Sequence, residues 1–474
     1  MHNNLLEKFN SGINWNALGY GVYKTLATLL TILLYRSLTT TDFALWANFN
    51  SVIYLALLWL DFGFRKSIPR YAPEFARNKP SMTRFIGSII TFQTIVLIAA
   101  FPLCIYLLAQ ITAPLIGTHA SSTLFIIGSC IFLTEGITSV LRLIYHAYFW
   151  NKQFNILVMG TECGKLALNA AVIITAQTSG QLLTGILINS IISSIIINII
   201  GIGMLSWLYK DASYPGTHEL DYEKTRTAFI KHSGIMWINN NLKSLSERNF
   251  LVPLLTHVLG PAQANLFKIA NDGALLFHRT IIKTIGTTDT ALLSHLQAIQ
   301  EQQKLIPFAF QKVTSKIAAL CVPLFGVLIL LYLLSDTIFV HSFVFKAFFT
   351  LTACYVLETL LSPYERVLEV KRCYWKLTFA YLPYITTIGL LFLGNKIPLI
   401  GLLTSIFVIQ GVRLVSSFLI VFFAHQEYAL VFPYKDVARK VLFWLPFFIL
   451  IFLLLFLAQD YLVPYIWLLL YKGK

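Results

Sequence analysis

The stretch from Gly260 to Leu305 joins an apolar helical pattern to a narrow line of polar side chains. Five of these side chains share one face of the predicted helix: Asn265, Lys268, Asp272, Arg279 and Lys283. At about 100° per residue they fall within a stripe about 60° wide. A charge at the centre of a bilayer costs at least about 2.5 kcal/mol. The stripe should therefore face other helices or a water-filled cavity, and we interpret it as part of a transport site. The alternative is an ion pair between Lys268 and Asp272, which are four residues apart.

Polar stripes also occur on three other predicted helices, at about 14–37, 42–62 and 229–258. The first carries Lys24, and the second ends in Asp61 and Arg65. The third contains WINNNLKSLSERN, with four candidate site residues: Asn240, Lys243, Glu247 and Arg248. Structural alternatives are open for each helix. Lys24 could pair with Asp61, Lys243 could pair with Glu247 within its helix, and Arg65 could only anchor the topology at the membrane boundary.

Other intramembrane charges are scattered along the chain. We interpret them as interhelical pairs or as snorkelling groups that reach the membrane surface. They are Glu135, Arg142, Glu162, Lys165, Glu358 and Arg413.

The composition places these residues in a membrane protein. The chain is 57% hydrophobic and 12% charged, with a mean hydropathy of +0.71, whereas soluble domains carry about 25% charged residues. Apolar runs long enough to span a bilayer recur throughout, so we predict an all-α, polytopic transmembrane bundle. The net charge of +15 is explained by Lys and Arg in loops rather than by nucleic-acid binding, since no zinc-finger spacing or long basic tract is present. The six cysteines form no C-x-x-C pair, so we expect no disulfide framework, metal site or cofactor.

The apolar runs predict helices that alternate across the membrane, and the N-terminus does not resemble a cleavable signal peptide. Basic residues concentrate in the segments 65–84, 208–228 and 366–376, which we assign to the cytoplasm together with the N-terminus. The sequence between 65 and 84 is interpreted as a loop, and a short fourteenth helix is expected at the end. The first thirteen predicted helices cover about 14–37, 42–62, 84–111, 122–147, 154–176, 182–208, 229–258, 263–288, 309–335, 343–364, 377–394, 398–423 and 440–458.

The helices fall into two halves with the same rhythm. We predict an N-terminal lobe at 1–209, a cytoplasmic linker at 210–228, a C-terminal lobe at 229–424 and additional helices at 437–474. Each lobe holds six helices, so the lobes should be related by an axis along the membrane normal, with the substrate site between them.

Three local sequences carry a family resemblance: DFGFRKSIPRYAPEFARNK after the second helix, RLIYHAYFWNKQFN after the fourth, and GPAQANLFKIAND at the start of the eighth. With the six-plus-six layout, the chain resembles the multidrug/oligosaccharidyl-lipid/polysaccharide (MOP) exporter superfamily, most of all its Wzx-type O-antigen flippases. The resemblance implies a cationic cavity that receives the pyrophosphate of an undecaprenyl-linked sugar. By helix position, its counterparts here would be Lys24, Arg65, Lys268 and Arg279.

These observations together predict a flippase that moves a polyprenyl-diphosphate-linked oligosaccharide to the outer leaflet of the bacterial inner membrane. The substrate-binding residues would be Lys24, Arg65, Asn240, Lys243, Arg248, Lys268, Arg279 and Lys283. H⁺ or Na⁺ coupling would fall to Asp61, Glu247 or Asp272. Alternatives are a multidrug/cation antiporter, a lipid II flippase and a membrane glycan polymerase. The polymerase is disfavoured because the outer connections are short, and no nucleotide-binding loop occurs, so we expect no enzyme. The protein should be a monomer among membrane lipids, alone or with polysaccharide assembly proteins.

Overall fold

The computed structural model describes residues 2–75, 79–116, 122–148, 150–211, 222–275, 278, 306–333, 342–389 and 402–471. Within these ranges every regular element is a helix and no strand occurs, which confirms the prediction of an all-α fold. The chain forms two compact units, Met1–Asn265 and Leu266–Lys474. The predicted lobe boundary at 210–228 stays a prediction.

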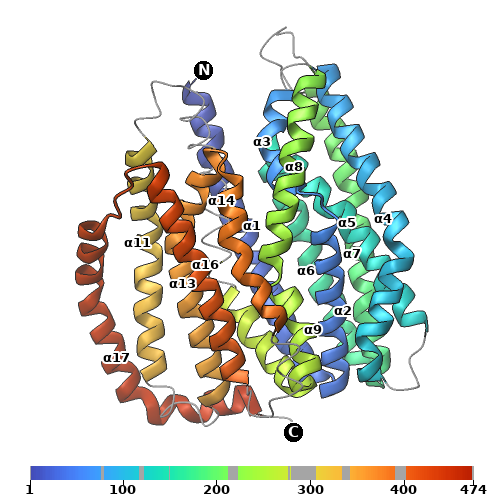
Figure 1. Cartoon of the computed structure of the whole chain (residues 1–474). Coiled ribbons are helices and arrows are strands. Elements are labelled where there is room, and N and C mark those ends of the chain that lie inside the picture. The colour runs from blue at the N-terminus through green and yellow to red at the C-terminus, as the bar shows by residue number, and fades with distance from the viewer. Residues whose placement is uncertain are drawn as a thin grey trace. The chain divides into compact units, whose positions relative to one another are not determined.

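The first unit is a bundle of long helices (Figure 1). They are α1 (His2–Ser37), α2 (Thr40–Trp59), α3 (Phe64–Phe75), α4 (Lys79–Ile116), α5 (Ser122–Ala147), α6 (Asn151–Thr175), α7 (Ser179–Asp211), α8 (Tyr222–Ser244) and α9 (Arg248–Leu259). Residues 261–265 begin a further helix. Helix α5 packs on α4 and α7, α6 packs on α7 and α1, and α2 contacts α8 and α9.

The segment predicted as a loop at 65–84 is mostly helical, so that prediction was wrong. Helix α3 continues from α2 after a bend of 49°, and α4 already begins at Lys79. The apolar side chains Phe64, Ile68, Tyr71 and Phe75 recur at helical spacing and are buried, while Arg65 faces outward. The prolines and charges of this segment suggested a loop. They are compatible with an amphipathic helix that buries one face against α5 and α8.

Gly63 fixes the bend between α2 and α3. Its φ of +78° lies in the left-handed region that favours glycine. A Cβ at this position would lie 2.2 Å from the backbone oxygen of Ser233 in α8. The Oδ1 of Asp61 accepts a hydrogen bond from the Gly63 N–H at 2.7 Å. The bend is therefore held by a local turn and by close backbone packing on α8.

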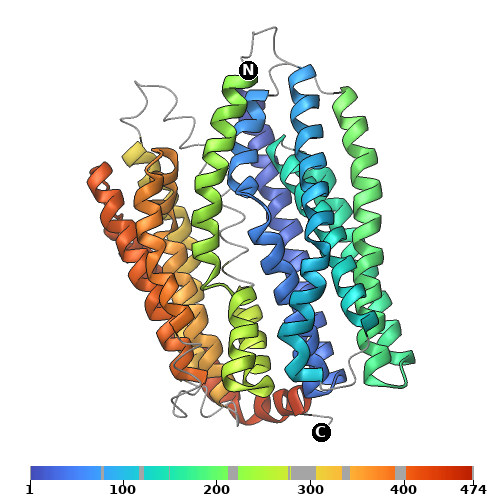
Figure 2. The same cartoon turned by 45° about the vertical axis from the view of Figure 1, so that its right-hand side comes forward.

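The helix predicted at 229–258 is broken at Leu245–Glu247, giving α8 and α9 (Figure 2). At the break the backbone N–H groups of Leu245, Ser246 and Glu247 bond three residues back rather than four, which tightens the last turn. Side-chain hydroxyls contribute as well. Ser244 donates to the Asn241 carbonyl at 2.7 Å and Ser246 to the Lys243 carbonyl at 3.0 Å. Such bonds compete with the helical ladder.

The second unit contains α11 (Ile306–Leu333), α13 (Ser342–Val370), α14 (Tyr374–Tyr381), the 3₁₀ turn η3 (Leu382–Ile385), α16 (Leu402–Glu427) and α17 (Tyr434–Tyr471). Helix α11 packs on α13 and α17, and α13 packs on α16. The predicted helix at 377–394 is interrupted by this 3₁₀ turn, where Pro383 cannot donate a backbone hydrogen bond. It is α-helical again at 386–389, and residues 390–394 lie outside the described residues.

The last two predicted helices form one helix, α17, so the expectation of a separate fourteenth helix was wrong. It runs without a break for 38 residues and changes direction along its length (Figure 1). Lys440 of α17 donates to the Ser315 hydroxyl of α11 at 2.7 Å.

A carboxylate connects the end of α16 to the α13–α14 connection. The Glu427 carboxylate accepts from Lys371 at 2.5 Å and from Lys376 at 2.7 Å. The hydrogen bond to Glu427 raises the pKa of Lys371, so this lysine stays charged at neutral pH. The connection is thereby held against the α16 terminus.

Several described helices are long and apolar enough to cross a membrane. Five qualify individually, and the bent pair α2–α3 gives a sixth. The five segments are Lys79–Thr112, Thr123–Ala147, Asn151–Thr175, Ser179–Leu208 and Thr404–Glu427. The predicted integral membrane location is consistent with these helices.

Candidate functional site

The break between α8 and α9 brings several predicted site residues together within a few residues of the chain. Lys243 lies in the last turn of α8, Glu247 is the N-cap of α9, and Arg248 is its first residue. All three side chains are partly buried. Because Lys243 and Glu247 lie on opposite sides of the break, the continuous helix that would pair them is absent. The Glu247 side chain makes no capping hydrogen bond.

The amides beside this break have unused hydrogen-bonding capacity. In the part of the chain that the structure describes, the buried Asn240 Nδ2 and Asn241 Oδ1 have no hydrogen-bond partner. Arg248 donates to the neighbouring Asn249 Oδ1 through Nε at 3.3 Å and Nη2 at 3.1 Å. The break thus presents two cations, one carboxylate and amide groups near the N-terminus of α9, which carries a partial positive charge.

Lys268 and Asp272 form a close ion pair, as the structural alternative from sequence predicted. The Nζ–Oδ2 distance is 2.7 Å and the side chains are 4% and 10% exposed. Asn265 of the same stripe donates from Nδ2 to the Thr40 carbonyl at 2.9 Å. Arg279 and Lys283 lie outside the described residues. A role of the stripe in transport therefore stays a prediction.

Asp61 and Arg65 form an ion pair at the bend between α2 and α3. Arg65 Nε lies 3.3 Å from Asp61 Oδ2, and the other carboxylate oxygen holds the Gly63 turn. The Arg65 side chain is 44% exposed, as expected for a residue at the end of a span. Lys24 lies in α1, but its side chain is outside the described residues, so its pairing with Asp61 stays a prediction.

Four of the charges that we interpreted as scattered lie close together in the first unit. Glu135 and Arg142 come from α5, and Glu162 and Lys165 from α6. Lys165 interacts electrostatically with both glutamates and with Tyr23, and Tyr54 interacts with the same group. We call these six residues the inner polar cluster: Tyr23, Tyr54, Glu135, Arg142, Glu162 and Lys165.

Direct contacts fix part of the inner polar cluster. Ser194 of α7 donates to Glu135 Oε1 at 2.6 Å. The Arg142 guanidinium lies 6.0 Å from the ring centre of Tyr23 and 5.9 Å from that of Phe154, at the outer range of cation–π attraction. The cluster therefore draws side chains from α1, α2, α5 and α6, and Ser194 of α7 contacts it.

Amide and hydroxyl groups extend this polar interior. Asn189 of α7 donates to Asn169 Oδ1 of α6 at 3.0 Å, and Thr138 of α5 donates to Asn198 Oδ1 of α7 at 2.8 Å. The sequence held a signal that we missed, because Asn155, Glu162, Lys165 and Asn169 share a stripe about 80° wide on one helix.

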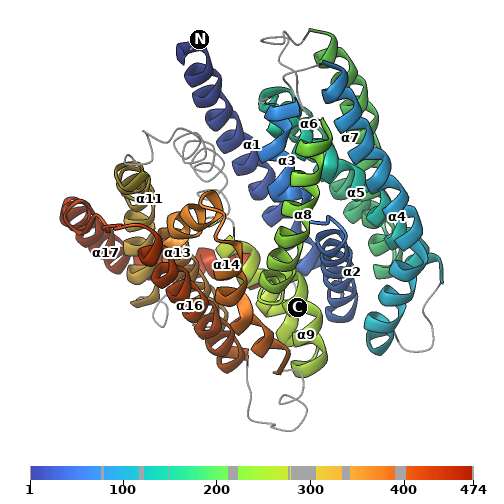
Figure 3. The same cartoon turned by 45° about the horizontal axis from the view of Figure 1, so that its top comes forward.

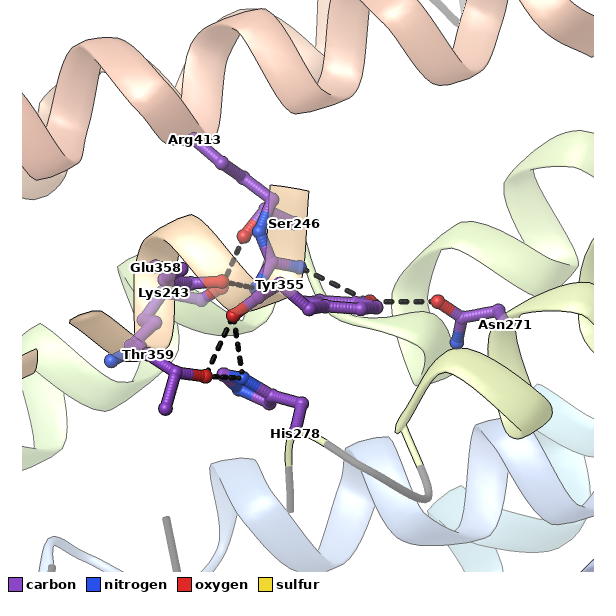
Figure 4. A network of polar contacts seen from close by, with 8 residues as sticks. All are labelled: Lys243, Ser246, Asn271, His278, Tyr355, Glu358, Thr359 and Arg413. Carbon is purple, nitrogen blue, oxygen red and sulfur yellow. Dashed lines mark hydrogen bonds and ion pairs between the residues drawn. The ribbon is translucent and has the colours of Figure 1, made fainter. Parts of the chain in front are cut away.

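The second-unit side chains labelled in Figure 4 form a second network: Asn271, His278, Tyr355, Glu358, Thr359 and Arg413. The Arg413 guanidinium forms an ion pair with Glu358 and lies 4.6 Å from the ring centre of Tyr355. The Tyr355 hydroxyl donates to Asn271 Oδ1 at 2.7 Å. Arg413 is 7% exposed and Tyr355 2% exposed. The guanidinium thus neutralises a largely buried carboxylate and stacks on an aromatic ring.

The same network determines which ring nitrogen of His278 carries a proton. Nδ1 lies 3.1 Å from the Tyr355 carbonyl and 2.7 Å from Thr359 Oγ1. The Thr359 hydroxyl itself donates to the Tyr355 carbonyl at 2.6 Å. A carbonyl can only accept, so Nδ1 must be the donor. The His278 ring also stacks on Tyr355, with centroids 4.9 Å apart.

Sequence comparisons find no matching family model and no matching curated protein. Solved structures are similar over most of the chain. The lipid II flippase MurJ in an inward closed conformation matches with a TM-score of 0.60 and 14% identity, covering 96% of this chain and 97% of that one. A MATE transporter from Vibrio cholerae matches with a TM-score of 0.62 and 14% identity, covering 89% and 98%.

The chain has the fold of MOP-superfamily transporters. A further neighbour is a MOP transporter from Pyrococcus furiosus, for which a reverse polarity of the binding pocket suggests a different function. It matches with a TM-score of 0.62 and 12% identity, covering 88% of this chain and 96% of that one. These low identities establish the shared fold and leave the substrate to be argued from this chain's own residues.

Proposed function

We propose that this MOP-fold protein is a flippase of the Wzx type. It moves a polyprenyl-diphosphate-linked oligosaccharide, such as an O-antigen repeat unit, from the cytoplasmic to the outer leaflet of the bacterial inner membrane. The observation that carries the proposal is the α8–α9 break. Lys243 and Arg248 flank a helix N-terminus there, and interrupted membrane helices use such N-termini to bind anionic groups of substrates.

The chemistry of the break suits a diphosphate. Arginine and lysine form short, charge-assisted hydrogen bonds to phosphate oxygens, and Arg248 presents a planar fork for two of them. Glu247 offsets one of the two cations and is the carboxylate that we propose for H⁺ or Na⁺ coupling. Asp61 and Asp272 are weaker candidates for coupling, because each already holds a cationic partner. The prenyl tail would remain in lipid.

Two other transport functions have specific support. A multidrug/cation antiporter is favoured by the carboxylates of Glu135 and Glu162 and by the likeness to MATE transporters. Lipid II is favoured by the likeness to MurJ over 96% of the chain. The cationic excess at the α8–α9 break favours an anionic substrate over a drug cation.

Purified protein in proteoliposomes tests the proposal. The probe is undecaprenyl-diphosphate-linked N-acetylglucosamine with a fluorophore on the sugar, and its appearance in the opposite leaflet is measured with an impermeant quencher. We expect Lys243→Gln and Arg248→Gln to slow flipping at least about tenfold, because each removes a charge-assisted contact. Lys231→Gln, an exposed cation on the same helix α8, is the control and should flip normally.

The same vesicles separate the alternatives. Transport of ethidium without flipping of the labelled lipid would overturn the proposal in favour of the cation antiporter. Flipping that is unaffected by both substitutions would remove the α8–α9 break from the substrate path.

A further inference from the structure

We propose that the inner polar cluster binds the uncharged, hydroxyl-rich glycan of the substrate, while the α8–α9 break binds its diphosphate. This inference rests on the proposed flippase function and adds a second binding site to it. The ligand class is a neutral oligosaccharide that offers hydrogen-bond donors and acceptors.

The position of the cluster requires an explanation other than anchoring at the membrane surface. Glu135 lies near the middle of α5 (Ser122–Ala147), and Glu162 and Lys165 near the middle of α6 (Asn151–Thr175). Both helices are candidate membrane spans. Side chains so far from the helix ends cannot snorkel easily to the surface. Charges at such depth are costly and usually mark a substrate or ion path.

The charges of the cluster are balanced. Two carboxylates, Glu135 and Glu162, accompany two cations, Arg142 and Lys165. Because these four charges cancel, the cluster has no net electrostatic preference for a diphosphate or for a cation. A sugar hydroxyl, in contrast, donates to a carboxylate and accepts from Lys or Arg. Tyr23 and Tyr54 add hydroxyls and ring faces to the same group.

Some polar groups of this interior have capacity left for a ligand. Among the described residues, no hydrogen bond or close ion pair joins the Glu162 carboxylate or the Lys165 ammonium group to a side chain; they interact only electrostatically. Asn169, about one helical turn beyond Lys165 on the same stripe, is 0% exposed. Its Nδ2 has no hydrogen-bond partner in the described chain. Leaving such groups unsatisfied is unfavourable, so hydroxyl groups of a ligand would stabilise them.

Metal binding is a less suitable use of the cluster. Among the described residues, no group of His, Cys, Asp and Glu side chains could hold a metal ion. The hydrogen bond from Ser194 to Glu135 already resembles the contact that a sugar hydroxyl would make.

The test compares two lipids that differ only in the sugar. Wild-type protein and variants in nanodiscs are titrated with bare undecaprenyl diphosphate and with undecaprenyl-diphosphate-linked N-acetylglucosamine. We expect the wild type to prefer the glycosylated lipid. Glu162→Gln and Glu135→Gln should lower this preference on the order of tenfold, which is typical of a lost hydrogen bond to a charged group. Their affinity for the bare lipid should stay unchanged, which also shows that they fold.

Two further variants calibrate the measurement. Cys163→Ser changes an exposed residue beside Glu162 on α6 and should leave both affinities unchanged. Lys243→Gln should weaken the binding of both lipids equally, because both carry the diphosphate.

The possible failures are distinguishable. A wild-type protein that binds neither lipid would overturn the proposed function, and the inference with it. A wild-type protein that binds both lipids equally would overturn the inference alone. The inference would also be overturned if the glutamine variants kept the full preference for the glycosylated lipid, or if they bound both lipids more weakly to the same extent.

Discussion

The Oγ of Ser67 in α3 lies 2.8 Å from Nδ1 of His232 in α8. Both residues are buried, and the ring of Tyr71 meets His232 edge-on at 5.6 Å. Nearby, Trp237 Nε1 donates to the Trp59 carbonyl at 2.5 Å. Figure 3 shows α3 beside α8. These contacts hold the bent end of the α2–α3 pair against α8, so any motion that separates the helices must break them.

The Ser67–His232 contact should contribute measurably to stability. We expect Ser67→Ala and His232→Ala each to lower the free energy of unfolding by about 1–3 kcal/mol, because each removes one member of a buried hydrogen bond. The double variant should lose less than the sum, with a coupling of about 0.5–1.5 kcal/mol. Denaturation in detergent for the four proteins of this cycle measures the coupling, and strictly additive losses would show that the two side chains do not interact.

Gly63 should tolerate no side chain. For Gly63→Ala we expect a loss of at least about 1–2 kcal/mol from the left-handed backbone alone. The Cβ would also lie 2.2 Å from the Ser233 carbonyl oxygen. Relieving this overlap requires α8 to move. Gly87→Ala in α4, where nothing lies within 4 Å of the new Cβ, is the matched control. Melting temperatures should fall for the first variant and hold or rise for the second; equal melting would contradict the packing of Gly63 on α8.

The Lys268–Asp272 pair can be separated into structural and transport roles. Lys268→Ala leaves the Asp272 carboxylate without its lysine, and breaking a buried pair costs about 3–5 kcal/mol. The double change Lys268→Ala with Asp272→Ala should recover most of this stability. If the stripe lines the substrate path, the stable double variant will still fail to export glycan. Recovery of export would leave the pair with a structural role only.

The network around Arg413 should show a graded response. Arg413→Gln breaks the ion pair with Glu358 and removes the stacking on Tyr355, so we expect a loss of about 3–5 kcal/mol. Tyr355→Phe removes only the hydroxyl that donates to Asn271 and should cost about 1 kcal/mol. Arg439→Gln, at an exposed position of α17, should have little effect. Thermal unfolding ranks the three, and a milder effect of Arg413→Gln than of Tyr355→Phe would contradict the assigned pairing.

Labelling of single cysteines tests the topology. We expect Lys79→Cys and Ala228→Cys, both at exposed positions, to react with an impermeant maleimide only after the cytoplasmic face is opened, because basic segments stay inside. The background should lack the native cysteines, since Cys163 is exposed. Position 72, in the same basic segment as Lys79, is a poor reporter because Ala72 is 0% exposed in α3. Labelling of either cysteine in intact cells would contradict the predicted orientation and indicate the opposite one.

Helix positions were largely predictable, because the lengths of the apolar segments can be read from the sequence. The helix expected at 122–147 is α5 with the same ends. Breaks were harder. The interruption at Leu245–Glu247 depends on serine hydroxyls that bond backward to the chain, and these residues are also tolerated within continuous helices.

The inner polar cluster was not predicted from the sequence, because it depends on how the helices pack against one another. Glu135 meets Ser194 only because α5 packs on α7, and no periodicity within one helix reveals its neighbour. The α6 stripe of Glu162, Lys165 and Asn169 was visible by helical spacing, but its meaning depends on the charges that α5 brings beside it.

The balance of charge inside the helices has an electrical consequence. Three sets of described ions are formally neutral: Glu135 and Glu162 with Arg142 and Lys165, Glu358 with Arg413, and Lys268 with Asp272. A neutral set that moves as a body through the membrane potential does no electrical work, whereas an unbalanced charge would exchange about 2.3 kcal/mol per 100 mV. These three sets should therefore contribute little gating charge to the voltage dependence of transport.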